Sequence, residues 1–473
     1  MKQEADVAVL ADGDIAVVVP GILGSSLERE NRQVWGYRQI GYNLFRLAEK
    51  LTQDLSLPPD AFDSPDVAFD TDVKATSVLS SCHLIPGFWS VDGYRAMVRS
   101  LRSRYAVQDI FTFPYDWRQS NRVSARRLGE FILPLLHRRR RTHPRARAVL
   151  IGHSMGGLVA RYYAACLDAD HNTRRVVTIG TPYLGSVKAL LVLARGTISL
   201  GPYTLDLANF ARSLPSVAEL LPIYPCVWSP DGEFGTIESH VVPGLPAHLT
   251  AHAIAFQRDI RDGMRRHGSQ APKFHAVVGH LQPTDVWVST ESGLQAYQPG
   301  DLADRGDGTV ARRSATPPEW ESDAAATFLP GKHASIHQQR ETLRHLHGIL
   351  TARPHVPMAV EDEIAVTALQ YAVTDHVWEI RAESCNGVDT LAIEVVVTDD
   401  TGQQLCAPIP LRPTGNLQYR AFWRPTTSGV FRWEVRPMAH AATPLEPISD
   451  LVLVGPPEKS GKGRPAAIAP SRR

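Results

Sequence analysis

The chain has 473 residues, more than one domain usually holds, so we expect two domains or one large domain with insertions. Hydrophobic residues make up 43% and charged residues 21%, the composition of a globular protein. Because 50 basic residues face 49 acidic ones, for a net charge of +1, the balance argues against a protein that binds nucleic acid through bulk charge.

The cysteines and the N-terminus bear on the compartment. The five cysteines are scattered and lack C-x-x-C spacing, which indicates neither a disulfide framework nor a zinc site and favours a reducing compartment. We see no signal peptide after the mixed-charge N-terminus and no run of 18 apolar residues. We therefore expect a cytoplasmic protein without metal or cofactor, whose contact with a membrane, if it has any, is peripheral.

The first predicted strand covers residues 15–19 and ends at Pro20 and Gly21. A loop follows through Glu28, and a glycine turn of this kind comes after many strands, so the junction alone carries little information. Residues 43–51 predict a helix. The Pro- and Asp-rich stretch 58–67 is either a surface excursion or part of a lid.

Residues 93–104 predict an amphipathic helix, and 107–113 a strand that ends at a Pro-Tyr-Asp-Trp-Arg sequence, residues 114–118. A long helix is expected over 121–141. Its basic end, residues 138–141, could contact anionic lipid. A solvated face with cations at a helix C-terminus explains it more simply.

Residues 148–163 predict a buried strand, a tight turn and a helix, with a G-x-S-x-G pattern at the turn, residues 152–156. This pattern is typical of the nucleophile elbow of α/β-hydrolases, and it makes Ser154 the candidate nucleophile. Two backbone N–H groups are candidates for an oxyanion site. One belongs to Met155, the residue after the nucleophile, and the other to Ile22, after the first strand.

A strand over 175–179 leads to Gly-Thr-Pro at 180–182, and the strand–helix alternation then stops. Residues 187–270 are apolar without clear periodicity, which suits a cap over an acyl-chain groove. Alternatively, they form a helical subdomain with its own core. The apolar residues concerned are Leu190, Leu191, Leu193, Tyr203, Phe210, Leu221, Tyr224 and Trp228.

Strands over 274–279 and 325–329 resume the sheet, and a helix through Leu350 closes it. Asp307 lies between two glycines after the first of these strands, and His333 follows the second. With Ser154 they give the Ser, Asp, His order of α/β-hydrolases. A serine hydroxyl needs an imidazole to take its proton, and the imidazole needs a carboxylate to fix its tautomer. Asp304 and His337 are the competing candidates.

Several motifs together resemble the lecithin:cholesterol acyltransferase family, which includes lysosomal phospholipase A2 and phospholipid:diacylglycerol acyltransferase. They occur in order at residues 20–25, 113–118, 152–158, 180–182, 214–222 and 306–310. The resemblance implies a serine esterase that passes an acyl group from a glycerolipid to an alcohol or to water, with oxyanion donors at Ile22 and Met155. Secreted members close a lid with an early disulfide, whereas residues 29–92 here hold only Cys82.

Beyond Pro354 the pattern alternates with period two in four segments, which predicts a small antiparallel β-sandwich. We therefore expect an α/β-hydrolase domain over residues 1–355 with a cap at about 187–270, an all-β sandwich over 356–455 and a disordered tail over 456–473.

Two function classes follow from the sequence. The first is a serine-dependent lipid ester hydrolase or O-acyltransferase that works through an acyl-enzyme. The second is a non-catalytic interaction protein that uses the sandwich to bind a protein partner. The ordered set of Ser154, Asp307 and His333 favours the first, since a scaffold has no physical need for all three.

Overall fold

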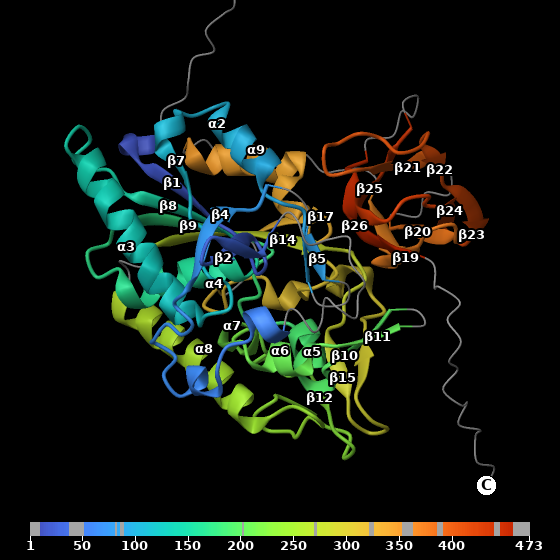
Figure 1. Ribbon diagram of the computed structural model, residues 1–473, viewed down its shortest axis with the longest axis horizontal. Coiled ribbons are helices and arrows are strands. Elements are labelled where there is room, and N and C mark those ends of the chain that lie inside the picture. The colour runs from blue at the N-terminus through green and yellow to red at the C-terminus, as the bar shows by residue number, and fades with distance from the viewer. Residues whose placement is uncertain are drawn as a thin grey trace, which may run out of the picture.

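The computed structural model describes residues 10–36, 52–80, 83–85, 89–200, 203–268, 272–320, 326–351, 363–385, 391–438 and 445–456 (Figure 1). Three predicted features lie outside these ranges: the helix over 43–51, the domain boundary at residue 355 and all but the first residue of the tail over 456–473. They stay predictions.

A six-stranded parallel sheet forms the centre of the molecule, as the sequence predicts for an α/β-hydrolase fold. Both faces of a parallel sheet are covered, and the adjacent inner strands β1 (Ile15–Val19) and β8 (Ala148–His153) are accordingly buried along their whole length. In sheet order the strands are β17 (Thr327–Pro330), β14 (Lys273–His280), β9 (Thr173–Ile179), β8 (Ala148–His153), β1 (Ile15–Val19) and β7 (Ile110–Thr112).

Alternate residues of β1 enter two different cores, because successive side chains of a strand point to opposite faces. Val17 packs with α3 (Asn121–Arg140) and α4 (Met155–Tyr162). Val18 packs with α2 (Arg95–Arg102) and α9 (Arg340–Leu350) on the other face (Figure 1).

The basic end of α3 contacts its own chain. Arg139 donates to the carbonyl of Gly13 at 2.8 Å, and Arg140 donates to the carbonyl of Ala146 at 2.9 Å. These contacts favour the simpler explanation of the cationic cluster over lipid binding.

The segment between β1 and α2 adds small antiparallel elements. These elements are β2 (Ser25–Arg29), β3 (Arg32–Trp35), η2 (Pro59–Phe62), β4 (Val73–Val78), β5 (His83–Ile85) and β6 (Trp89–Val91).

Strand β7, which follows α2, starts later than predicted, because residues 107–109 form a 3-10 turn in which Val107 is exposed.

The insertion after β9 is more regular than the sequence indicated, and it ends in the long helix α8 (Ala247–His267). Leu190, Phe210 and Leu221 are fully buried in the same core as α3 and α4. This packing favours a core position for these side chains over a place in a substrate groove, and the core is shared with the sheet domain and is not a separate core of the insertion.

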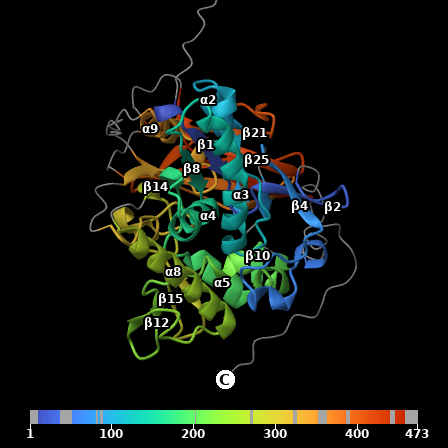
Figure 2. The same cartoon turned by 90° about the vertical axis from the view of Figure 1, so that its left-hand side faces the viewer.

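The other elements of this cap are α5 (Val187–Arg195), β10 (Thr197–Leu200), β11 (Tyr203–Asp206), α6 (Ala208–Arg212), α7 (Pro215–Ala218), β12 (Val227–Trp228) and β13 (Phe234–Gly235). Two further strands, β15 (Trp287–Ser289) and β16 (Gln295–Tyr297), extend the sheet of β12 and β13. Figure 2 shows α5, α8, β10, β12 and β15 together in the lower part of the view.

A fully buried carboxylate, Glu219, connects the cap to the start of α3. It accepts hydrogen bonds from the Ser120 hydroxyl at 2.6 Å, the Asn121 backbone N–H at 2.7 Å and the Arg122 guanidinium at 3.1 Å. His252 of α8 lies 3.0 Å from the same carboxylate. The cap is therefore fastened to the sheet domain by a charge-assisted network.

Two sheets of mainly antiparallel strands enclose a separate core at the C-terminal end, as predicted; Trp378, Trp433 and Val395 lie in it. One sheet contains β18 (Ile364–Ala368), β20 (Trp378–Ser384), β24 (Gln418–Trp423) and β23 (Arg412–Gly415). The other contains β19 (Tyr371–Val373), β26 (Ile448–Gly455), β25 (Gly429–Pro437), β21 (Ile393–Thr398) and β22 (Ile409–Pro410). Within the described ranges, no helix has the length and apolar character needed to cross a bilayer.

Candidate active site

Ser154 occupies the sharp turn between β8 and α4, with φ 53° and ψ −127°. A non-glycine residue rarely adopts this conformation, and such strain is concentrated at functional sites. The turn is tight on both sides. A Cβ on Gly156 would lie 2.3 Å from the carbonyl oxygens of Val19 and Pro20, and one on Gly152 would lie 2.5 Å from the Gly157 Cα. The two glycines of the motif are thus required by close backbone contact.

His333 lies between Ser154 and Asp307, and all three side chains are buried. Its Nε2 is 2.8 Å from the Ser154 Oγ, and its Nδ1 is 2.6 Å from the Asp307 Oδ2. Because a carboxylate only accepts, the proton of a neutral His333 lies on Nδ1, and Nε2 is free to take the serine proton. The geometry is that of a nucleophile, a base and an orienting carboxylate.

Asp307 is held by its own loop. Its Oδ1 accepts hydrogen bonds from the backbone N–H groups of Thr309 at 2.9 Å and Val310 at 2.7 Å. Its backbone carbonyl accepts from the His333 N–H at 2.8 Å. The loops that carry the carboxylate and the imidazole are therefore joined through the backbone as well as through the side chains.

The two competing candidates lie elsewhere. Asp304 is exposed on a 3-10 turn, η6 (Leu302–Asp304). His337 is buried behind the site, and its Nε2 lies 2.6 Å from the Gly93 carbonyl. Burial lowers the pKa of His337 to about 4, so the ring is neutral near pH 7.

The predicted oxyanion donors lie beside the serine. A Cβ on Gly21 would come within 2.9 Å of the Ser154 Cβ, so the loop that continues to Ile22 passes directly over the nucleophile. Met155 is the first residue of α4, where backbone N–H groups have no partner within the helix. Among the described residues, neither the Ile22 nor the Met155 N–H donates a hydrogen bond. Both are therefore available to an oxyanion.

A chain of hydrogen bonds behind the site joins this loop to His333. The Gly21 N–H donates to the Tyr94 hydroxyl at 2.7 Å, and that hydroxyl lies 2.8 Å from the His153 Nδ1. The His153 Nε2 lies 3.0 Å from the His333 carbonyl. Burial lowers the pKa of His153, and the two nearby histidines lower it further. A neutral ring that accepts at Nδ1 and donates at Nε2 satisfies every partner.

Sequence reasoning missed Tyr94, which looked like one apolar residue of the amphipathic helix. It is 1% exposed and lies 73 residues from its Gly21 partner, so no local pattern indicates its role.

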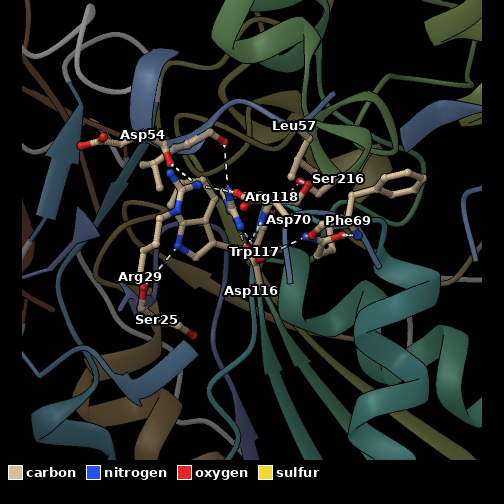
Figure 3. Close-up of polar contacts among 12 residues, drawn as sticks. Ser25, Arg29, Asp54, Leu57, Phe69, Asp70, Asp116, Trp117, Arg118 and Ser216 are labelled. Atoms are coloured by element: carbon tan, nitrogen blue, oxygen red, sulfur yellow. Dashed lines mark hydrogen bonds and ion pairs between the residues drawn. The ribbon is translucent and has the colours of Figure 1, made fainter. Parts of the chain in front are cut away.

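The Pro-Tyr-Asp-Trp-Arg segment also holds the loop that follows β1, and Figure 3 shows its residues Trp117 and Arg118 together with Ser25 and Asp70. The Tyr115 hydroxyl donates to the Pro20 carbonyl at 2.8 Å, and the Trp117 indole N–H donates to the Ser25 carbonyl at 3.2 Å. Arg118 is fully buried, and its guanidinium bridges Asp116 at 2.8 Å and Asp70 at 2.7 Å. These contacts connect the first strand's loop with the segment before β4.

The described residues contain no group of three His, Cys, Asp or Glu side chains placed to hold a metal ion.

Residues 63–253 match the model of the lecithin:cholesterol acyltransferase family. The chain is also 31% identical over 255 residues to a human protein (Homo sapiens), lysosomal phospholipase A and acyltransferase, an alignment that covers 46% of this chain and 59% of that protein. Over the part that these matches cover, this chain is similar to the lecithin:cholesterol acyltransferase family. The residues matched by the family model include Ser154 and the Pro-Tyr-Asp-Trp-Arg segment and end before Asp307 and His333.

The chain is also 28% identical over 204 residues to phosphatidylcholine-sterol acyltransferase of Gallus gallus, an alignment that covers 38% of this chain and 48% of that protein. The chain thus spans about half the length of these two relatives. Among solved structures, lipase BlEst2 of Bacillus licheniformis in its propeptide form aligns over 90% of this chain and 72% of that one. The alignment has 16% identity and a TM-score of 0.35.

Proposed function

We propose that this protein is a serine-dependent hydrolase or O-acyltransferase that acts on glycerolipid-type esters through an acyl-enzyme. The proposal is carried by one observation. Ser154, His333 and Asp307 are connected by hydrogen bonds, and they lie beside the backbone N–H groups of Ile22 and Met155, which donate no hydrogen bond among the described residues. The lipid substrate is suggested by the similarity to the lecithin:cholesterol acyltransferase family and by the names of the two relatives, a lysosomal phospholipase A and acyltransferase and a phosphatidylcholine-sterol acyltransferase.

In the acylation step, the His333 Nε2 accepts the Ser154 hydroxyl proton while the Oγ attacks the ester carbonyl carbon. The negative charge that develops on the carbonyl oxygen is stabilised by the N–H groups of Ile22 and Met155. Asp307 stabilises the imidazolium that forms. His333 then gives the proton to the leaving alcohol oxygen, and the acyl group stays on Ser154.

In the deacylation step, the second substrate loses its proton to His333 as it attacks the acyl-enzyme, and His333 gives that proton to the Ser154 Oγ as the bond between Oγ and the acyl group breaks. Water gives a free fatty acid, and an alcohol gives a new ester. The same residues serve both outcomes, so the acceptor decides whether the protein acts as a hydrolase or as a transferase.

A fluorophosphonate probe tests the nucleophile, since it reacts with an activated serine. We expect the wild-type protein to be labelled and to release fatty acid from phosphatidylcholine vesicles, with an acyl ester as a further product when a primary alcohol is added. Ser154→Ala should remove labelling and turnover while the fold is kept, a loss of about 10⁶ in kcat. Turnover above roughly one per cent of wild type in Ser154→Ala would exclude this serine.

A further inference from the structure

Asp307 and His333 follow β14 and β17, the last two strands at one edge of the central sheet. The C-terminal sheets lie against this edge, with β25 and β26 near β17 in Figure 1. An edge strand has a neighbouring strand on one side only. The position of the loops near that edge therefore depends also on contacts with structure outside the sheet.

We propose that the C-terminal sheets position Asp307 and His333 for the reaction, with Gln282 and Arg432 as the positioning residues. This inference rests on the proposed function and adds a role for the β-strands beyond residue 363.

Gln282 links the Asp307 loop to β18. It is fully buried, its backbone N–H donates to the Gly306 carbonyl at 2.9 Å, and it forms bridge pairs with Gly306 and Asp307. Its side chain binds the other partner: Nε2 donates to the Ile364 carbonyl at 3.1 Å, and Oε1 accepts from the Val366 N–H at 3.1 Å. One amide side chain thus makes the two hydrogen bonds that a neighbouring strand would make.

Thr284 strengthens the same connection. Its hydroxyl donates to the Gln282 carbonyl at 2.7 Å and accepts from the N–H groups of Gly306 at 3.1 Å and Gly308 at 2.8 Å. The residues on both sides of Asp307 are therefore tied to the segment that Gln282 fixes against β18.

The His333 loop is attached to β26 and to the turn before it. The Ser335 hydroxyl donates to the Ser449 carbonyl, and the Gln339 side chain donates to the Pro447 carbonyl at 3.4 Å. Both donors lie within six residues of His333.

Arg432 of β25 makes the third connection, through Asp92. The guanidinium pairs with the Asp92 carboxylate, which is 2% exposed, with Nε at 3.0 Å. The Asp92 N–H donates to the Ala334 carbonyl at 3.0 Å, and the Asp92 carbonyl accepts from Gln338 at 2.7 Å. Burial raises the pKa of Asp92 to about 6, and Arg432 opposes this effect, so the pair keeps a charge in place beside the His333 loop.

These contacts bear on rate because a misplacement of about 1 Å in a reacting group can cost roughly 100-fold. The test uses the full chain with Gln282→Ala, and Gln404→Ala as the matched control. Gln404 also donates its side-chain amide to a backbone carbonyl, that of Cys406 at 2.6 Å, but in an exposed turn of the C-terminal sheets. The readouts are the fluorophosphonate labelling rate, kcat and KM on p-nitrophenyl butyrate, and the folded fraction by circular dichroism.

We expect Gln282→Ala to lower kcat and the labelling rate of the folded protein by about 10-fold or more with KM nearly unchanged, and Gln404→Ala to leave both at wild-type values. Arg432→Ala should lower the same two rates, and Arg432→Lys, which keeps a cation for Asp92, should restore most of the loss. A folded Gln282→Ala variant that reacts at the wild-type rate would overturn the inference, as would a loss that matches the unfolded fraction. If the wild-type protein is not labelled at all, the proposed function fails and this inference fails with it.

Discussion

Tyr94→Phe removes one hydroxyl that serves two buried partners, the Gly21 N–H and the His153 Nδ1. A buried polar group that loses its partner costs about 1–3 kcal/mol. With two such groups, we expect the free energy of unfolding to fall by about 2–6 kcal/mol. We also expect kcat to fall by about 10- to 100-fold, because the loop that carries the Ile22 N–H loses its anchor and an oxyanion donor is worth about 100-fold or more.

The matched control is Tyr224→Phe, which removes a buried hydroxyl bound to a single carbonyl, that of Val286 at 3.1 Å, in the cap. Chemical denaturation gives the stability of both variants, and turnover of a short p-nitrophenyl ester is measured where both are folded. The control should lose about 1–3 kcal/mol without a change in kcat. If Tyr94→Phe is also destabilised with an unchanged kcat, Tyr94 is only a structural residue and the reasoning is refuted.

Three other outcomes are expected. Asp307→Asn should lower kcat by about 10⁴ in a folded protein, whereas Asp304→Asn, in the same loop but exposed, should leave kcat unchanged. A larger loss of kcat in Asp304→Asn than in Asp307→Asn would assign the carboxylate's role to Asp304 instead. Phe210→Ala should destabilise the protein by about 3–5 kcal/mol and reduce turnover of long and short esters in the same proportion, and a selective loss on long esters would restore the groove reading. His337 has a folded pKa of about 4 and an ordinary pKa near 6.5, so the unfolded chain binds its proton more tightly. The free energy of unfolding should therefore be higher by about 3 kcal/mol above pH 6.5, and this difference should be lost as the pH falls towards 4. Denaturation curves of His337→Gln that keep the full wild-type pH dependence would contradict this.

The local part of the site could be predicted from the sequence. The turn at Ser154 depends on neighbouring glycines, and the order of Ser154, Asp307 and His333 follows from strands that the apolar pattern already indicates. Tyr94 and Gln282 could not be predicted, because their partners lie about 60 to 85 residues away along the chain. Only the folded chain brings these groups together.

The cap shows where the apolar pattern misleads. Helix α8 places Leu249, Ala253, Phe256 and Ile260 on one buried side, but a small alanine and the neighbouring His252 obscure the stripe in the sequence. Apolar content also cannot tell a substrate groove from a packed core. Phe210 and Leu221 have the character that either would need, and their burial is decided by tertiary packing.

The Glu219 network has a consequence for how a lipid would enter. Lifting the cap away from α3 would separate a fully buried carboxylate from three donors on residues 120–122, and charge-assisted hydrogen bonds of this kind are among the strongest in proteins. The cap core is continuous with the core under the sheet, so the same movement would also expose apolar surface. We therefore expect the insertion to stay in place against α3 while substrate binds. A covalent cross-link between the cap and α3 should then leave the turnover rate unaltered, with substrate reaching Ser154 past other segments of the chain.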